Sequence, residues 1–158
     1  MIGGLAGNAT FNDMASLSIT NATGNGLSVS NVASGAAAGF GTVTISGAGG
    51  NGIEIANNAG QVTFSGATSV TMGSAANTAG IDFSGTNASV LFGATTVHNI
   101  GANQTGIDFS GSSTAASLAA TITGLGDLTS RGIDLSSTTG NKVITFFQGS
   151  SIANVGIG

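Results

Sequence analysis

The chain has 158 residues, of which 41% are hydrophobic and only 5% are charged, and its formal net charge is −4 at pH 7. Its two basic residues, Arg131 and Lys142, are too few for nucleic-acid binding, because phosphate contacts need Lys and Arg. The lack of cysteine excludes disulfides and thiolate metal sites, and no run approaches the roughly 20 apolar residues of a membrane helix. A surface of uncharged polar residues favours an extracellular fibre or repeat protein over a cytosolic enzyme.

A short motif recurs along the chain at a nearly constant spacing. Its leading glycine is found at positions 26, 52, 80, 106 and 132, so the steps are 26, 28, 26 and 26 residues. The clearest copies read Gly-Ile-Asp-Phe-Ser-Gly, at 80–85 and at 106–111. A fixed period of this size indicates a solenoid, in which each repeat packs on its neighbours.

Each period contains three short segments that read as β-strands. The first follows the leading glycine, as in 107–109, where apolar residues alternate with a polar one. The second is clearest at 62–64, and the stretch 36–40 is a poor match to it. The third is clearest at 42–45, and Asn and Gly fill the turns between strands. Helix signals are weak, and the best of them, at 117–121, runs into a β-branched strand.

These patterns predict an all-β protein, folded as a right-handed parallel β-helix with three strands and about 26 residues per coil, in about six coils. We expect residues 1–158 to form a single domain, which is a segment of a longer repeat protein or a filament subunit. Residues one period apart should stack about 4.8 Å from one another. Two inward columns are expected, one of Ile53, Ile81, Ile107 and Ile133, and one of Ile55, Phe83, Phe109 and Leu135.

The run from 52 to about 132, with its GIDFSG, TVT, SVTMG and TIT segments, resembles the repeats of large bacterial secreted β-helix proteins. These include autotransporter passenger domains and filamentous-haemagglutinin-like adhesins. The resemblance implies an exported right-handed β-helix that serves as a stalk, an adhesin or a surface-layer component. It also implies a location outside the cell or on the bacterial cell surface. The motifs of such repeats mark the coil and specify no activity.

An acidic residue occupies the same position in four consecutive coils: Glu54, Asp82, Asp108 and Asp134. These carboxylates are expected to face outward, and like charges stacked at about 5 Å repel one another. Three forms of compensation are open: bound Ca²⁺, which takes carboxylate ligands, a pKa raised by the neighbouring carboxylates, and solvation in a row that deters aggregation between sheets. The solvated row is favoured, and Ca²⁺ is the one candidate cofactor.

The third strands carry a row of hydroxyl groups on their outward face. The candidate binding face consists of Thr42, Thr44, Ser69, Thr71, Thr96, His98, Thr121 and Thr123, with Ser16 and Ser18 as equivalents in the first coil. Inward positions between them are expected for Leu17, Val43, Val70, Val97 and Ile122. A flat Thr-x-Thr array resembles the ice-binding face of β-solenoid antifreeze proteins. Threonine is also favoured in strands for its propensity and its cross-strand pairing.

The functional hypothesis is a non-enzymatic, extracellular structural or adhesive module. Its expected partners are copies of itself, stacked end to end, because a terminal coil exposes unpaired backbone and an open apolar core. Glycans or surfaces are further possible partners. One alternative is an ice-binding solenoid, and another is a polysaccharide-active protein, which would need clustered carboxylates with basic partners in a groove. No catalytic residue is predicted, since the single histidine, His98, has no adjacent Ser-Asp arrangement.

Overall fold

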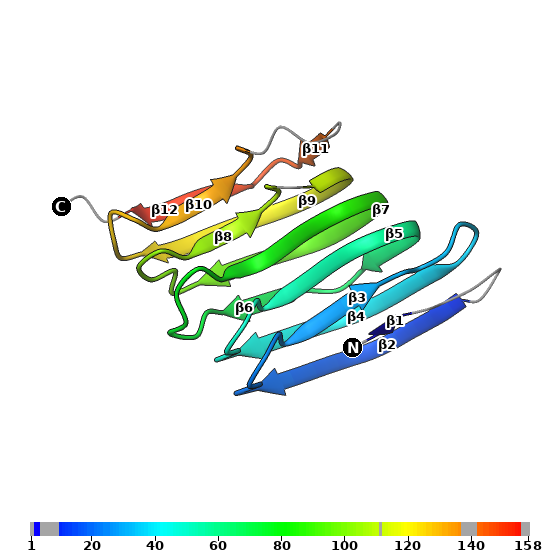
Figure 1. The fold of residues 1–158 in the computed structure, drawn as a ribbon, viewed down its shortest axis with the longest axis horizontal. Helices are drawn as coiled ribbons and strands as arrows, with labels where there is room; N and C mark the ends of the chain where they lie inside the picture. Colours follow the sequence, from blue (N-terminus) through cyan, green and yellow to red (C-terminus); the bar gives the residue numbers. More distant parts are fainter. Residues whose placement is uncertain (1, 4–9, 111, 137–141, 156–158) are drawn as a thin grey trace.

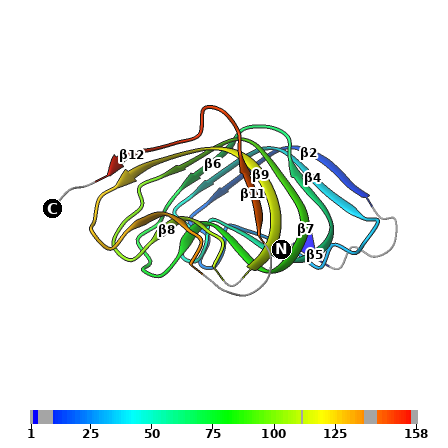
Figure 2. The same cartoon turned by 90° about the horizontal axis from the view of Figure 1, so that it is seen from above.

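The structure is a computed structural model, which describes residues 2–3, 10–110, 112–136 and 142–155. The described residues form strands and turns and contain no helix. All their strands pair in parallel within one sheet, which winds into a β-solenoid of about five turns. The coils rise from the N-terminal coil to the C-terminal coil in Figure 1, and they overlie one another when seen from above in Figure 2. The predicted all-β, parallel solenoid with a 26-residue coil is therefore confirmed.

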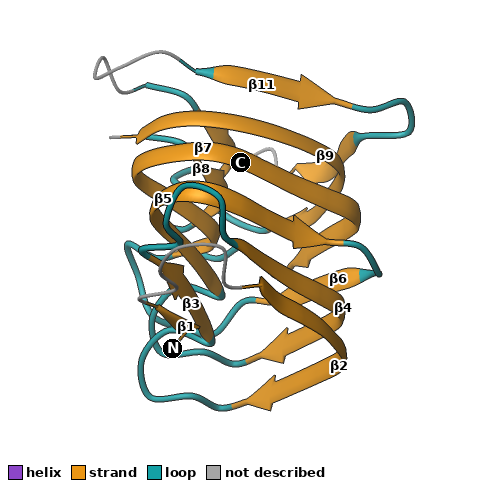
Figure 3. Cartoon of the chain, turned by 90° about the vertical axis from the view of Figure 1, so that its right-hand side faces the viewer, coloured by secondary structure: helices purple, strands orange, loops and turns teal. Residues whose placement is uncertain are grey.

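Long strands bend around the corners of the coil, so that one strand contributes to two or three faces (Figure 3). The first face carries the Gly-Ile-Asp strands, the second the strands that end in phenylalanine, and the third the hydroxyl-bearing strands. In chain order, the strands are β1 (Ile2–Gly3), β2 (Thr10–Thr20), β3 (Leu27–Ser30), β4 (Ala37–Ser46), β5 (Ile53–Phe64), β6 (Thr68–Thr71), β7 (Ala79–His98), β8 (Thr105–Asp108), β9 (Ser112–Leu125), β10 (Arg131–Asp134), β11 (Val143–Phe146) and β12 (Ser151–Val155).

Equivalent residues of successive coils pair in register on the first face. Ile53 pairs with Ile81, Ile81 with Ile107, and Ile107 with Ile133, as the repeat predicts. The first three of these isoleucines are fully buried. Leu135 is an exception to the second predicted column, because it is 52% exposed. It lies just beyond β10, outside the paired register of that strand.

Two stacks of phenylalanine rings run along the core. Phe83 and Phe109 are parallel, with ring centroids 4.5 Å apart, which confirms that they are buried neighbours. On the second face, Phe64 stacks on Phe92 at 4.1 Å and on Phe40 at 4.8 Å. The stacks meet edge to face, where Phe83 lies 6.3 Å from Phe92. Offset and edge-on ring contacts of this kind add to the free energy gained by burial, so the rings tie successive coils and neighbouring faces together.

The repeated glycine is required by the closeness of two faces. A Cβ atom on Gly106 would lie 2.6 Å from the carbonyl oxygen of Gly132 in the next coil and 3.0 Å from a methyl group of Ile122. A Cβ atom on Gly26, Gly52 or Gly80 would lie equally close, at 2.6–2.7 Å, to the carbonyl oxygen of the next glycine in the series, so no side chain fits at these positions either. A left-handed backbone conformation turns the corner after the first face, where Asn31, Asn57 and Gly85 all have φ between 55° and 61°. Asparagine and glycine tolerate this left-handed backbone best.

The weakest matches to the repeat also fold as strands. Residues 37–40 pair with 61–64 in β5, and Phe40 is buried there. The segment 117–121, which has the best helix signal, lies within β9, where Leu118 and Ala120 are buried. Packing against the neighbouring coils therefore overrides the local preference for helix. Within the part of the chain that the structure describes, no helix is long and apolar enough to cross a membrane.

Candidate functional surfaces

The four acidic residues of the repeat form one column on the first face. Glu54 pairs with Asp82, Asp82 with Asp108, and Asp108 with Asp134. The first three side chains are half-buried, whereas the side chain of Asp134 is only 7% exposed. The column therefore forms as predicted, but it is not the fully solvated row that the sequence favours. Burial makes compensation of the negative charge more necessary, because a low dielectric strengthens repulsion between carboxylates.

Asparagine side chains from the turns compensate the two carboxylates nearer the N-terminal coil, Glu54 and Asp82. Asn25 and Ser28 donate to the Glu54 carboxylate, both at 2.9 Å. Asn51 donates to Asp82 Oδ2 at 3.0 Å, while its own Oδ1 accepts the backbone N–H of Ala79 at 2.8 Å. Each asparagine thus satisfies a carboxylate and a backbone group at the same corner. The sequence contains these residues as ordinary turn formers, so their second role could not be inferred from composition.

The two carboxylates nearer the C-terminal coil, Asp108 and Asp134, are compensated differently. Asp108 accepts the backbone N–H of Ser110 at 2.6 Å, and Asp134 accepts that of Ser136 at 2.8 Å. Asp134 also forms an ion pair with Arg131 at 2.7 Å. Arg131 is 66% exposed, so its guanidinium covers the buried carboxylate from the solvent side. Arg131 is therefore part of the column.

The pKa values along the column diverge. The pKa of Asp82 is raised to about 6, first by burial and then by the charges of Asp108 and Glu54. The pKa of Asp134 is lowered, mainly by its hydrogen bonds to Ser136 and further by Arg131. One predicted form of compensation, a raised pKa, is thus found at Asp82. At neutral pH this carboxyl group still carries most of a negative charge, and it takes up a proton in mildly acidic solution.

The carboxylates do not gather into a chelating group. Among the described residues there is no set of three or more His, Cys, Asp or Glu side chains placed to hold a metal ion. A Ca²⁺ site needs six to eight oxygen ligands around one point, whereas a ladder column spreads its carboxylates along a line. The Ca²⁺ hypothesis for Glu54, Asp82, Asp108 and Asp134 therefore gains no support from the geometry.

The hydroxyl groups of the third face form two columns, in a register that differs from the predicted one. Thr44 pairs with Ser69, and Ser46 pairs with Thr71. The repeat in the sequence predicts instead that Thr42 lies beside Ser69 and Thr44 beside Thr71, and this prediction is wrong. Paired residues of these two strands are 25 residues apart, as in Thr44 and Ser69, whereas the predicted pairs are 27 residues apart, so the strands are displaced by two residues. A slip of two keeps every side chain on its face, which is why outward and inward positions were still correctly predicted.

The corrected register produces one unbroken column of hydroxyl groups across six stacked strands, β2, β4, β6, β7, β9 and β12. Its members are Ser18, Thr44, Ser69, Thr96, Thr121 and Ser151. The neighbouring column has Thr20, Ser46, Thr71 and His98, with Thr123 hydrogen-bonded to His98 Nδ1 at 2.9 Å. Thr42 lies beside Ser16 and thus outside both columns. All predicted residues of this face are exposed or half-buried, so they remain available for contact.

A column of buried polar side chains runs inside the corner between the first and second faces. Asn58 and Asn87 are at most 1% exposed. Asn58 Nδ2 donates to Asn87 Oδ1 at 3.0 Å, and Asn87 Nδ2 donates to Thr114 Oγ1 at 3.2 Å. Asn58 Oδ1 also accepts the N–H of Val32 at 3.0 Å. The sequence analysis missed this column, although two asparagines one coil apart, each shortly after a first strand, were a visible signal.

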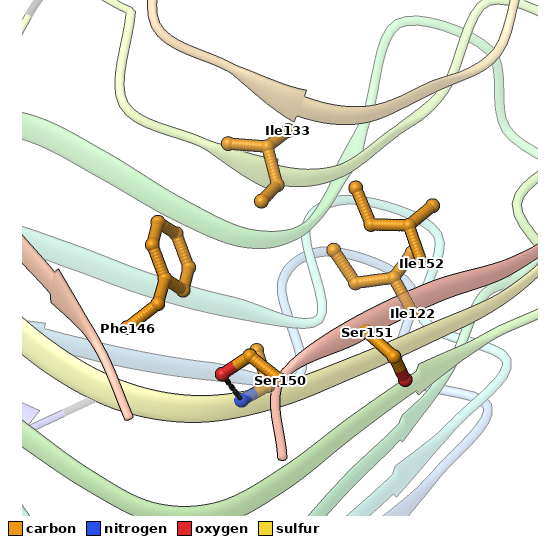
Figure 4. Close-up of a pocket in the computed structure, with 7 residues that line it drawn as sticks. Ile122, Ile133, Phe146, Ser150, Ser151 and Ile152 are labelled. Carbon is orange, nitrogen blue, oxygen red and sulfur yellow. Dashed lines mark hydrogen bonds between the residues drawn. The ribbon is translucent and has the colours of Figure 1, made fainter. Parts of the chain in front are cut away.

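An apolar surface lies on the C-terminal coil, at the top of the stack. Figure 4 shows Ile133, Phe146 and Ile152 around a hollow of about 220 Å³, whose floor includes Ile122 of the preceding coil. Ser150 anchors the loop beside it, because its Oγ accepts the backbone N–H of Ala120 at 3.1 Å. Phe146 is 37% exposed and Ile152 is 47% exposed. The sequence analysis expected an open apolar end, but it could not say which side chains form it.

Comparison with known proteins gives no relationship for this chain. No protein-family model matches it, and neither a curated protein nor a solved structure matches at a significant level. The resemblance to secreted bacterial β-helix repeats therefore stays a prediction, and function has to be argued from the surfaces described above.

Proposed function

We propose that this chain is a non-enzymatic structural module, a rigid β-solenoid rod that acts outside the cell or on a bacterial surface. One observation carries the proposal: the side chains most able to do chemistry are engaged in hydrogen bonds between coils or within turns. The carboxylates of Glu54 and Asp82 are held by Asn25 and Asn51, and Asp134 is held by Arg131. These groups stiffen the stack.

A polysaccharide-active enzyme is less well supported by the same surface. Such an enzyme needs an acid and a base that face one substrate, often with basic groups that bind the sugar acid. A polar hollow beside the acidic column is lined by Asp82, Asp108 and Arg131. Arg131 is already paired with Asp134, which leaves the hollow with two adjacent carboxylates and neutral neighbours.

An extracellular location is supported by composition, because the surface has few charges and the chain has no cysteine.

The test of the structural role compares catalysis by the wild type with that by the double variant Asp82→Asn/Asp108→Asn. Both proteins would be incubated with a panel of neutral and anionic polysaccharides, and newly formed chain ends would be measured. We expect no release above the level of the double variant. Release by the wild type that disappears in the double variant would contradict the proposal and would identify the acidic hollow as an active site.

A second candidate function, binding to a regular surface such as ice or a crystalline glycan, is favoured by the hydroxyl column. Six hydroxyl groups at the coil spacing of about 4.8 Å present a flat and periodic array. The test is thermal hysteresis and sedimentation with insoluble polysaccharides. Thr96→Lys changes the centre of the hydroxyl face, and Asp82→Lys, on the first face, is the matched control. Binding that is lost only in Thr96→Lys would establish this function. No binding by the wild type would exclude it.

A further inference from the structure

Among the described residues, no further coil covers the inward-facing side chains of the C-terminal coil, whereas their equivalents in the preceding coil are covered by it. Phe146 pairs with Leu118, and Ile152 pairs with Ile122. Leu118 and Ile122 are fully buried, whereas Phe146 and Ile152 are 37% and 47% exposed. The strands β10, β11 and β12 also have one unpaired edge, since among the described residues each pairs only with β8 or β9. This surface has both the backbone groups and the apolar side chains of a coil-to-coil interface.

The N-terminal coil presents the complementary surface. Within the described part of the chain, β2 pairs on one edge only, with β4. Met14 and Ile19 of β2 are half-buried, and both belong to columns that end at the C-terminal coil. The first column runs Met14, Phe40, Phe64, Phe92, Leu118 and Phe146. The second runs Ile19, Ile45, Val70, Val97, Ile122 and Ile152.

Charge distinguishes the two ends. Both basic residues of the chain, Arg131 and Lys142, lie in the C-terminal coil, where they balance Asp127 and Asp134. The other four acidic residues, which begin with Asp13 in β2, carry the entire net charge of −4. The N-terminal coil itself carries one of these four, Asp13, so a contact between unlike ends sets a neutral coil against a coil of charge −1, whereas a contact between two N-terminal ends sets two coils of charge −1 together.

We propose that the C-terminal coil binds the N-terminal coil of a second copy of this chain, head to tail, with β2 of the second copy pairing in parallel with β11 and β12. This inference rests on the proposed structural role and names its partner. Met14 of the second copy then covers Phe146, and its Ile19 covers Ile152. The contact continues the pairing already made between β9, β11 and β12. A head-to-tail contact leaves a free end at each addition, so the product is an open filament.

The first experiment blocks one end at a time. Ile152→Asp disables the C-terminal surface and Ile19→Asp disables the N-terminal surface, while Leu91→Asp, at a residue of 39% exposure in the middle of the stack, is the matched control. Light scattering over a concentration series should show growing oligomers for the wild type and for Leu91→Asp, and monomers for each end variant. An equimolar mixture of the two end variants should form a dimer that grows no further, because each partner retains one working end.

The second experiment tests the register without disturbing the apolar surface. Ser18 and Ser151 belong to the same hydroxyl column, so in the filament they are adjacent, at about 4.8 Å, a separation that a disulfide can span. The chain has no cysteine, so Ser18→Cys and Ser151→Cys each introduce a single thiol. Oxidation of their mixture should give the crosslinked heterodimer, and Ser69→Cys, from the middle of the column, should give none with either.

Several results would overturn the inference. These are a wild type that stays monomeric over the whole series, a Ser151→Cys protein that crosslinks mainly to itself, or an Ile19→Asp variant that still dimerises. The last two would indicate a symmetric contact between like ends. Circular dichroism of each variant verifies that its strand content is unchanged. A monomeric wild type would leave the structural role intact, because that role is tested by the absence of catalysis.

Discussion

The central coils and the C-terminal coil contain the same kinds of residue at the same positions, yet they differ in burial. Phe92 and Ile107 in the centre are fully buried, whereas Phe146 at the top is 37% exposed. The difference comes from the number of neighbours, since a central coil packs against two others and the last described coil packs against one. In a solenoid, stability is close to a sum of terms between nearest neighbours. The C-terminal coil therefore shows what one coil loses when its neighbour is missing.

The largest effect is expected when an aromatic ring of the central stack is removed. Phe109→Ala should lower the free energy of unfolding by about 3–5 kcal/mol, because it leaves a cavity beside Phe83. The matched change at the open end, Phe146→Ala, should cost roughly 1 kcal/mol in dilute protein, where the ring is only partly buried. Denaturant titration measures both. Equal losses would show that the two coils do not differ in packing.

A smaller loss is expected in the buried asparagine column. Asn87→Ala removes the donor to Thr114 and the acceptor for Asn58, so it should cost about 1–3 kcal/mol through unsatisfied buried groups. Ser89→Ala, at an exposed residue of the same strand β7, serves as the control and should cost far less. If the two variants melt at the same temperature, the buried column does not hold the coils together.

The pH dependence of stability should separate the middle of the acidic column from its last member. Because the pKa of Asp82 is raised to about 6 when folded, its protonation stabilises the fold fully below the unfolded pKa of about 3.8, and this contribution is lost as pH rises through 6. Asp134 has a lowered pKa, so its contribution is present above 3.8 and lost as pH falls. Asp82→Asn should therefore flatten the decline in melting temperature between pH 4 and 7.

The matched variant, Asp134→Asn, should lower the melting temperature at neutral pH, because it removes the partner of Arg131. This lowering of the melting temperature should become smaller in acid. Asp82→Asn should act with the opposite sign, because it reduces the decline in melting temperature toward neutral pH. Identical pH profiles for the two variants and the wild type would mean that the carboxylates do not differ in environment.

The smallest effect is expected from removal of divalent cations. The acidic column spreads its carboxylates along a line, so a chelator should leave the melting curve unchanged. A melting temperature that falls with chelator, and that Asp108→Asn makes insensitive to it, would restore the Ca²⁺ hypothesis.

The sequence predicted the parallel solenoid and its inward columns because glycine spacing and apolar alternation are set by the backbone of each coil. The predictions from sequence were wrong or incomplete where register, pairing or burial depended on contacts between neighbouring coils. The slip at Thr44 and Ser69 arises because the turns of the two coils differ in length, so paired residues are 26 apart on the first face, 24 on the second and 25 on the third. The buried Asn58 and the pairing of Arg131 with Asp134 depend on where turns bring side chains from different coils. The exposure of Phe146 depends on whether another coil packs on it, and no local sequence pattern predicts that.

The central claim is that the C-terminal coil is an open coil-to-coil interface, and hydrogen exchange measured over a range of protein concentrations tests it most directly. Amides of β7 should be strongly protected at every concentration, because two coils flank them. Amides of β11 and β12 should exchange quickly in dilute protein and become protected as concentration rises and a second copy binds. Strong protection of β11 and β12 in the dilute monomer, or exchange that does not change with concentration, would contradict the account.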